Sequence, residues 1–108
     1  MDPTEKVQPL TDAESWEVLR GQALGRLAYQ VAGEVFIVPV NFVVDGDRVV
    51  FRTAEGNKLF GTTVNHRVAF EVDDVEADHA VSVVARGLTR HLTGAAAEEA
   101  EGLPLHPW

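Results

Sequence analysis

Short runs of apolar residues, separated by polar turns, fill most of this chain, a pattern typical of β-strands. The runs that predict strands cover residues 27–31, 35–44, 48–53, 67–73 and 80–92. Asp45-Gly46 joins the second run to the third, and an Asp-Gly pair in such a place is a strong hairpin signal because glycine tolerates a positive φ. Ala32-Gly33-Glu34 predicts an earlier turn. The spacing indicates a mainly β protein, a small antiparallel barrel of about six strands with short flanking helices.

Three shorter segments predict helices beside the barrel. Thr11 and Glu14 fit the S/T-x-x-E capping box at the start of a helix that Gly21 would end. Residues 57–65 predict a short helix, and residues 95–101 predict another, which the following glycine would stop. Residues 1–10 are expected to form an extended arm and residues 103–108 an irregular tail. The whole chain, 1–108, is therefore expected to be a single domain.

The segment 35–44 is apolar at nearly every position, and only Pro39 and Asn41 interrupt it. A strand with one buried face should alternate, so this strand needs cover on both faces. One face fills the barrel, and a second copy of the chain is the simplest cover for the other face. We therefore expect a homodimer formed through this strand, since two-fold pairing is the commonest oligomeric arrangement.

Composition narrows the classes of partner. The chain has 108 residues, no cysteine, and a formal net charge of -8 from 9 basic and 17 acidic residues. An acidic surface repels nucleic acid and anionic membranes, so neither is an expected partner. The absence of cysteine excludes disulfides and thiolate metal sites and fits a reducing compartment. Without a membrane-length apolar run or a secretory leader, a soluble cytoplasmic protein is the expectation.

Two cations stand out against this acidic background. Arg52 and Thr53 end the third predicted strand, and Lys58 falls in the first turn of the helix predicted next. If Phe51 points into the barrel, Arg52 points outward to the expected partner, where an unpaired charge would be costly. A ligand phosphate suits the guanidinium fork and also a helix N-terminus. A salt bridge to a carboxylate is the structural alternative, and the residues alone leave both open.

Other polar residues carry weaker signals. Asn41 either bonds a neighbouring strand or meets the polar edge of a bound ring, and Ser82 interrupts an apolar strand in the same way. The four histidines are far apart in sequence, and none is expected to bind a metal. The acidic residues between 73 and 78 are interpreted as a solvated loop rather than a calcium site. No catalytic acid, base or nucleophile is assigned, because no hydrolase, P-loop or dinucleotide motif is present.

The segments VPVNFVVDG, VVFRTAEGNK and VAFEVD, in this order and spacing, resemble the pyridoxamine 5'-phosphate oxidase-like family of split β-barrel flavoproteins. The likeness runs from about Gly25 to Leu92 and is closest to the short actinobacterial-type members. It implies a split β-barrel that pairs as a homodimer and binds flavin at the dimer interface.

The resemblance also implies roles for single residues. The strand of residues 38–42 would lie along the isoalloxazine ring, Arg52 and Lys58 would hold the ribityl phosphate, and Ser82 would reach the ring from the partner subunit. FMN is the expected cofactor, with a deazaflavin as the alternative and heme less expected. The expected cofactor-binding residues are Pro39, Val40, Asn41, Arg52, Thr53, Lys58, Ser82 and Trp108.

The function implied is that of a flavin-dependent oxidoreductase, in which the protein binds and orients a cofactor that transfers hydride or electrons. Its small-molecule substrate or electron donor stays open. The alternative is a flavin- or heme-binding protein without turnover, for storage, sensing or stress protection, since one fold hosts several functions. Asn57-Lys58 stands where true oxidases have adjacent basic residues, and their C-terminal arginine and histidine have no counterpart here. Oxidation of pyridoxamine phosphate is therefore not expected, and a final strand of relatives is expected to be missing or supplied otherwise.

Overall fold

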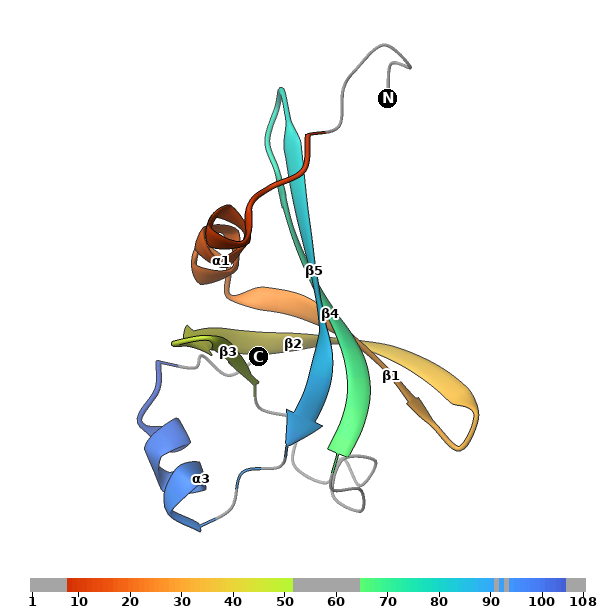
Figure 1. Ribbon diagram of the computed structural model, residues 1–108, viewed down its shortest axis with the longest axis vertical. Helices are drawn as coiled ribbons and strands as arrows, with labels where there is room; N and C mark the ends of the chain where they lie inside the picture. The colour runs from red at the N-terminus through yellow and green to blue at the C-terminus, as the bar shows by residue number, and fades with distance from the viewer. Residues whose placement is uncertain (1–7, 52–64, 91, 93, 105–108) are drawn as a thin grey trace.

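The computed structural model describes residues 8–51, 65–90, 92 and 94–104. The five described strands form one antiparallel sheet in the order β3-β2-β1-β4-β5. Its twist turns β4 and β5 across β1 and β2, so that the sheet curls into half of a barrel (Figure 1). The predicted mainly β fold is confirmed, and the curled sheet is consistent with a split β-barrel. The elements are α1 (Asp12–Arg20), β1 (Leu24–Val31), β2 (Glu34–Asp45), β3 (Arg48–Phe51), β4 (Asn65–Val75), β5 (Ala80–Arg90) and α3 (Gly94–Glu101).

Tight reversals connect the first three strands where the sequence predicts them. Ala32 and Gly33 lie between β1 and β2. Gly46, with a φ of 63°, opens the reversal between the paired residues Asp45 and Arg48. The Arg48 guanidinium donates to the Asp45 carboxylate at 2.7 and 3.1 Å, which closes the base of this turn. The Asp-Gly hairpin is confirmed.

The inner face of the curled sheet carries the core, to which each described strand and α1 contribute. Leu27 and Val72 are the most deeply buried large side chains, with 0% and 1% of their surface exposed. Phe42 and Phe70 pack edge to face in the same core, with ring centroids 4.8 Å apart. The buried hydrophobic residues of this core are Leu19, Leu27, Tyr29, Val40, Phe42, Phe70, Val72 and Val83. Val50 is buried too, but its pairing with Val43 places it on the other side of the sheet.

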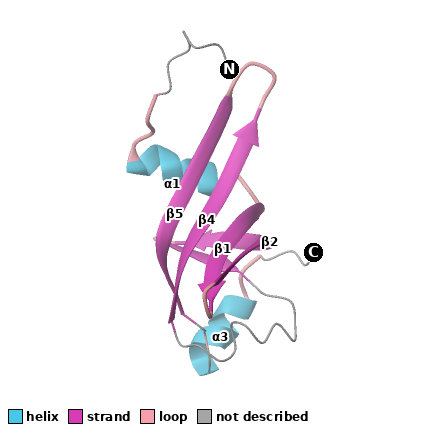
Figure 2. Ribbon diagram, turned by 90° about the vertical axis from the view of Figure 1, so that its right-hand side faces the viewer, coloured by secondary structure: helices cyan, strands magenta, loops and turns pink. Residues whose placement is uncertain are grey.

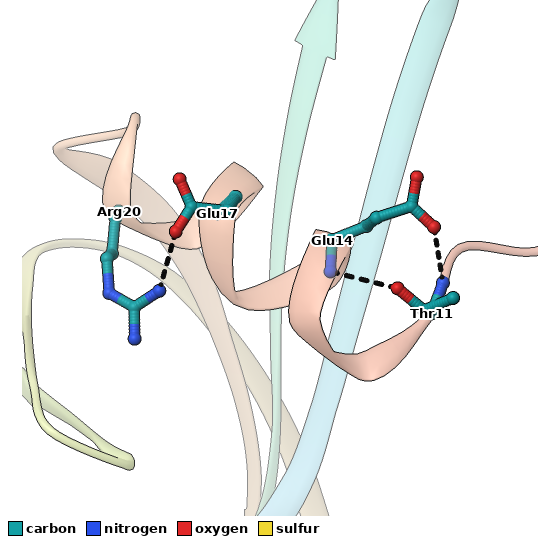
Figure 3. A network of polar contacts seen from close by, with 4 residues as sticks. All are labelled: Thr11, Glu14, Glu17 and Arg20. Carbon is teal, nitrogen blue, oxygen red and sulfur yellow. Dashed lines mark hydrogen bonds and ion pairs between the residues drawn. The ribbon is translucent and has the colours of Figure 1, made fainter.

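α1 begins at the predicted capping box. The Glu14 N–H donates to Thr11 Oγ1 at 3.1 Å, and the Thr11 N–H donates to the Glu14 carboxylate at 3.0 Å (Figure 3). Two otherwise unpaired backbone donors at the helix start are thereby satisfied. Leu19, near the other end of α1, is 3% exposed and anchors the helix to the core. Gly21 ends the helix, as predicted.

β4 and β5 lie side by side and form a long two-stranded ribbon along the length of the molecule, as Figure 2 shows. β4 extends two residues beyond the predicted strand 67–73, because Asp74 and Val75 pair with Val81 and Ala80 of β5. The loop is thus reduced to residues 76–79. β1 also begins earlier than predicted, at Leu24, through its pairing with β2.

The last helix, α3, agrees with the prediction within one residue at its start. The helix predicted at residues 57–65 lies outside the described residues, apart from Asn65, which begins β4. Most of the predicted N-terminal arm and C-terminal tail lies outside them as well. Within the described ranges, neither helix is long and apolar enough to cross a membrane.

Candidate functional site

β2 separates its side chains onto two very different faces. Val40 and Phe42 point into the core, each with 4% of its surface exposed. Val35 and Ile37, on the other side of the strand, are 75% and 66% exposed. The expectation that this strand is apolar on both faces is confirmed. In the part of the chain that the structure describes, the core covers one of these faces and the other is open.

The open face of β2 continues across the sheet, and we call it the outer face. Directly opposed residues of antiparallel strands point to the same side. Ile37 is paired with Ala28 of β1, which is paired with Ala69 of β4. Ala69 is in turn paired with Arg86 of β5. Following this alternation, the exposed large hydrophobic residues among those described all lie on the outer face: Leu24, Val35, Ile37, Val75, Val84 and Leu88.

Pro39 and Asn41 both lie on the outer face of β2, with the buried Val40 between them. The Phe42 N–H donates to the Ala23 carbonyl on the β1 side, at 3.0 Å. Backbone N–H groups point to alternate edges along a strand, so the nitrogen of residue 39 faces the edge away from β1. A proline at this position therefore removes no hydrogen bond to β1. Among the described residues, pairing with β3 on that edge begins only at Phe42. Pro39 therefore lies beside a stretch of strand edge that no described residue of β3 pairs with.

Ser82 lies on the same outer face but far from Asn41. Ser82 is exposed in β5, and β1 and β4 lie between its strand and β2. Three interstrand spacings amount to about 14 Å between the two backbones. Within one chain, a single ring could not easily contact both side chains. This separation agrees with the expectation that Ser82 reaches the ring from the partner subunit, which stays a prediction.

Charged residues interrupt the apolar surface of the outer face. Arg26 of β1 lies 4.0 Å from Asp73 of β4, measured from Nη1 to Oδ1, and both side chains are about half exposed, at 54% and 53%. At that exposure, solvent screening leaves the ion pair little stabilising effect. These two charges lie on the interior strands β1 and β4, between the exposed apolar residues of β2 and those of β5.

The other site residues predicted from the sequence lie outside the described residues: Arg52, Thr53, Lys58 and Trp108. The neighbouring Phe51 packs against the core from a position opposite Phe42. Phe51 thus points inward. The prediction that Arg52 points outward was made on this condition.

A cavity of about 390 Å³ lies where α1 ends, between the last part of β2 and Pro104. Arg20 at its rim is held by Glu17, whose Oε1 accepts from Arg20 Nη1 at 3.0 Å (Figure 3). Pro39, Asn41 and Ser82 do not line this cavity. It is therefore separate from the site predicted on the outer face.

The hairpin between β4 and β5 gathers a histidine and two carboxylates, which sequence reasoning alone does not bring together. His79 Nδ1 lies 2.8 Å from Asp78 Oδ1, and His79 Nε2 lies 3.7 Å from Glu76 Oε2. The adjacency of Asp78 and His79 was visible in the sequence. The approach of Glu76 was not, because it depends on how tightly the hairpin turns.

The family model and a similar solved structure agree on one family. A family model for pyridoxamine 5'-phosphate oxidase matches residues 11–108. The structure of the FAD binding protein from Mycobacterium smegmatis is similar, with 40% identity and a TM-score of 0.82, and the match covers 94% of this chain and 85% of that one. A candidate pyridoxamine 5'-phosphate oxidase from Corynebacterium glutamicum has 42% identity and a TM-score of 0.76, over 92% of this chain and 79% of that one.

Among curated proteins, an uncharacterized protein of Mycobacterium tuberculosis strain H37Rv is 43% identical over 67 residues. That match spans 61% of this chain and 61% of the length of the curated relative.

Proposed function

This chain belongs to the pyridoxamine 5'-phosphate oxidase family, and from that premise we propose that it binds a flavin and acts as a flavin-dependent oxidoreductase. The observation that carries the proposal is the outer face, where exposed apolar side chains adjoin Pro39 and Asn41. A flat, largely apolar ring requires an apolar surface with a few polar groups at its rim. The residues beside the open edge of β2 fit such a ring, and the similar M. smegmatis protein is named for FAD binding.

FMN is the cofactor that we propose. Pro39 would pack on the ring and Asn41 would hydrogen-bond its polar edge. For Val40, whose side chain lies in the core, the backbone is the part available to the ring. Arg52, Thr53 and Lys58 would hold the phosphate, and Trp108 would pack on the ring, as the family resemblance implies. The name of the M. smegmatis relative makes FAD the first alternative, ahead of a deazaflavin and heme.

A second copy of the chain is the partner that we propose for the outer face. Removing Val35, Ile37 and Leu88 from water would stabilise the pair by about 25 cal/mol for each Å² of apolar surface buried. Ser82 would then approach the ring bound along β2 of the other chain. This assembly accounts for an apolar face that has no cover among the described residues, and for the distance between Ser82 and Asn41.

The flavin, when bound, supplies the transfer of hydride or electrons. The chain contributes binding, orientation and exclusion of water at the interface. We assign no acid or base to the described side chains of the outer face. The small molecule that exchanges electrons with the flavin is left open by the proposal.

The absorption spectrum of the purified protein tests flavin binding directly. We expect flavin absorption bands that are released on denaturation, and the mass of the released chromophore separates FMN from FAD and from a deazaflavin. A colourless protein that takes up none of these cofactors on titration would sink the proposal.

A binding protein without turnover is the second candidate, favoured by the relative that is named for binding rather than for a reaction. Anaerobic reduction of the bound flavin by nicotinamide cofactors, followed by reoxidation with candidate acceptors, separates the two functions. Repeated reduction and reoxidation supports the oxidoreductase. A flavin that no nicotinamide cofactor reduces supports the binding protein.

A further inference from the structure

The tip of the β4–β5 hairpin lies at the end of the molecule opposite α3 (Figure 1). Strand pairing ends at Val75 and Ala80. Beyond that pair, the Glu76 N–H donates to the His79 carbonyl at 2.8 Å. Only residues 77 and 78 remain to reverse the chain, so Glu76 and His79 are held opposite one another across a short turn.

The side chains of this turn converge as well. One potential ligand atom from each of Glu76, Asp78 and His79 lies within 4.8 Å of the other two. The two carboxylates address different nitrogens of the imidazole, Asp78 at Nδ1 and Glu76 at Nε2. A proton on Nδ1 can be donated to Asp78, and the lone pair of Nε2 then faces the Glu76 carboxylate.

We propose that Glu76 and His79 bind a divalent transition-metal ion such as Zn²⁺, and that Asp78 orients the imidazole for it. Zinc bonds to nitrogen and oxygen are about 2.1 Å long. An ion at that distance from both His79 Nε2 and Glu76 Oε2, which are 3.7 Å apart, would make an angle of about 124° with them, and the tetrahedral angle of about 109° requires the two atoms to approach by about 0.3 Å. Water completes the coordination.

The ligand types select the class of metal. Imidazole together with carboxylate suits zinc and its neighbours, whereas calcium prefers a set made of oxygen atoms alone. A metal-bound histidine commonly donates its other ring N–H to a carboxylate, which is the place that Asp78 occupies at 2.8 Å. The bound ion would link Glu76, just before the reversal, to His79, just after it.

The competing explanation is a plain ion pair, with protonated His79 between two carboxylates. These side chains are 55% to 88% exposed, and ion pairs at such exposure contribute little to stability. The acidic chain would also attract any cation without a specific site, and Asp74 lies close by in β4. The experiment must therefore separate coordination by His79 from general attraction.

Titration of the whole protein with Zn²⁺, followed by NMR of the histidine ring nitrogens and the backbone amides, makes that separation. We expect a saturable shift of His79 Nε2 and of the amides of residues 75–80. His79→Gln should abolish this shift, and Glu76→Gln should weaken binding by about tenfold or more. Asp78→Asn should weaken it by about tenfold, the effect usual for loss of a carboxylate behind a metal-bound histidine.

Asp74→Asn is the matched control, because it removes the same charge from the same hairpin without removing a ligand. It should change the Zn²⁺ affinity by less than about threefold. Shifts at the tip that persist in His79→Gln would overturn the proposal, as would an equal loss of affinity in Asp74→Asn and Glu76→Gln. The three residues are exposed, so the variants should melt at the wild-type temperature in the absence of zinc, and circular dichroism checks this.

Discussion

The ring of Phe70 lies so close to the backbone of Gly25 that a β-carbon on Gly25 would collide with it. The same ring meets Phe42 edge to face, with an angle of 73° between the ring planes. One aromatic side chain of β4 thus contacts β1 on one side and β2 on the other. Because Phe42 follows Asn41 directly, the contact between Phe42 and Phe70 also helps to position the part of β2 that carries the proposed flavin site.

Gly25→Ala should destabilise the protein by about 1–3 kcal/mol, since the added methyl must displace a packed ring. The free energy of unfolding in urea measures the effect. Gly87→Ala is the matched control, because a β-carbon at Gly87 of β5 meets nothing within 4 Å. Equal stability of the two variants would mean that the Phe70 ring yields without cost.

The capping box should give α1 a dependence on pH. The hydrogen bond from the Thr11 backbone, followed by that from the Thr11 side chain, lowers the pKa of Glu14 from its ordinary value of 4.5. A carboxyl with a lowered pKa in the folded state stabilises the fold above its unfolded pKa, and this stabilisation is lost as the pH falls through the folded pKa.

Wild type should therefore lose its advantage over Glu14→Gln as the pH falls from neutrality to below 4.5. Urea unfolding of both proteins across this range measures the difference. A difference that is constant with pH would show that the Glu14 charge has no part in the cap. Glu17→Gln, in the same helix but outside the capping box, serves as the comparison.

Ile37→Glu should dissociate the proposed homodimer, because it places a charge in the apolar part of the outer face, which the proposed partner would remove from water. We expect the dimer dissociation constant to rise at least about tenfold, measured by analytical ultracentrifugation. Ala95→Glu adds the same charge on the exposed helix α3 and should leave the dimer intact. A dimer that tolerates Ile37→Glu would have to form through another surface.

Arg52→Ala and Lys58→Ala should each weaken flavin binding by about 1.5–3 kcal/mol, the usual effect of losing a hydrogen bond to a charged group. Lys58→Ala should leave the dimer intact. Isothermal titration with FMN gives the affinities. Arg20→Ala is the control, because Arg20 is paired with Glu17 beside a separate cavity. Unchanged affinity in both test variants would place the phosphate elsewhere.

Mixing two defective chains tests whether the partner subunit completes the site. Asn41→Arg and Ser82→Trp should each block flavin binding in their own homodimers. In a mixed dimer, one interface site would carry both changes and the other site neither, so about half of the flavin capacity should return after mixing. Flavin absorbance of the separated mixed dimer measures this. No recovery would mean that both residues serve the same site from one chain.

Local signals in the sequence predicted the local structure well. The capping box of Thr11 and Glu14 and the Asp45-Gly46 hairpin each depend on side chains only a few residues apart. The end of β4 did not follow from its own residues, because Asp74 disfavours a strand and is held in one by pairing with Val81 of β5. The approach of Glu76 to His79 is local, three residues along the chain, but it depends on the tight turn that closes the hairpin.

The candidate site shows a similar limit. A strand that is apolar at nearly every position gives no alternation from which to read its inner and outer residues. The family resemblance implied that Pro39, Val40 and Asn41 all lie along the ring, and the pattern of the strand could not separate them. Pairing with β1 assigns Val40 to the core and its two neighbours to the outer face.

That division along β2 has an evolutionary consequence. In the proposed flavin site, substitutions at Pro39 and Asn41 would alter ligand recognition while Val40 and Phe42 continue to pack in the core. Stability and the proposed ligand preference would thus depend on separate residues of a single strand. Relatives could exchange one flavin, or one reaction, for another by changing alternate positions, without having to repack their cores.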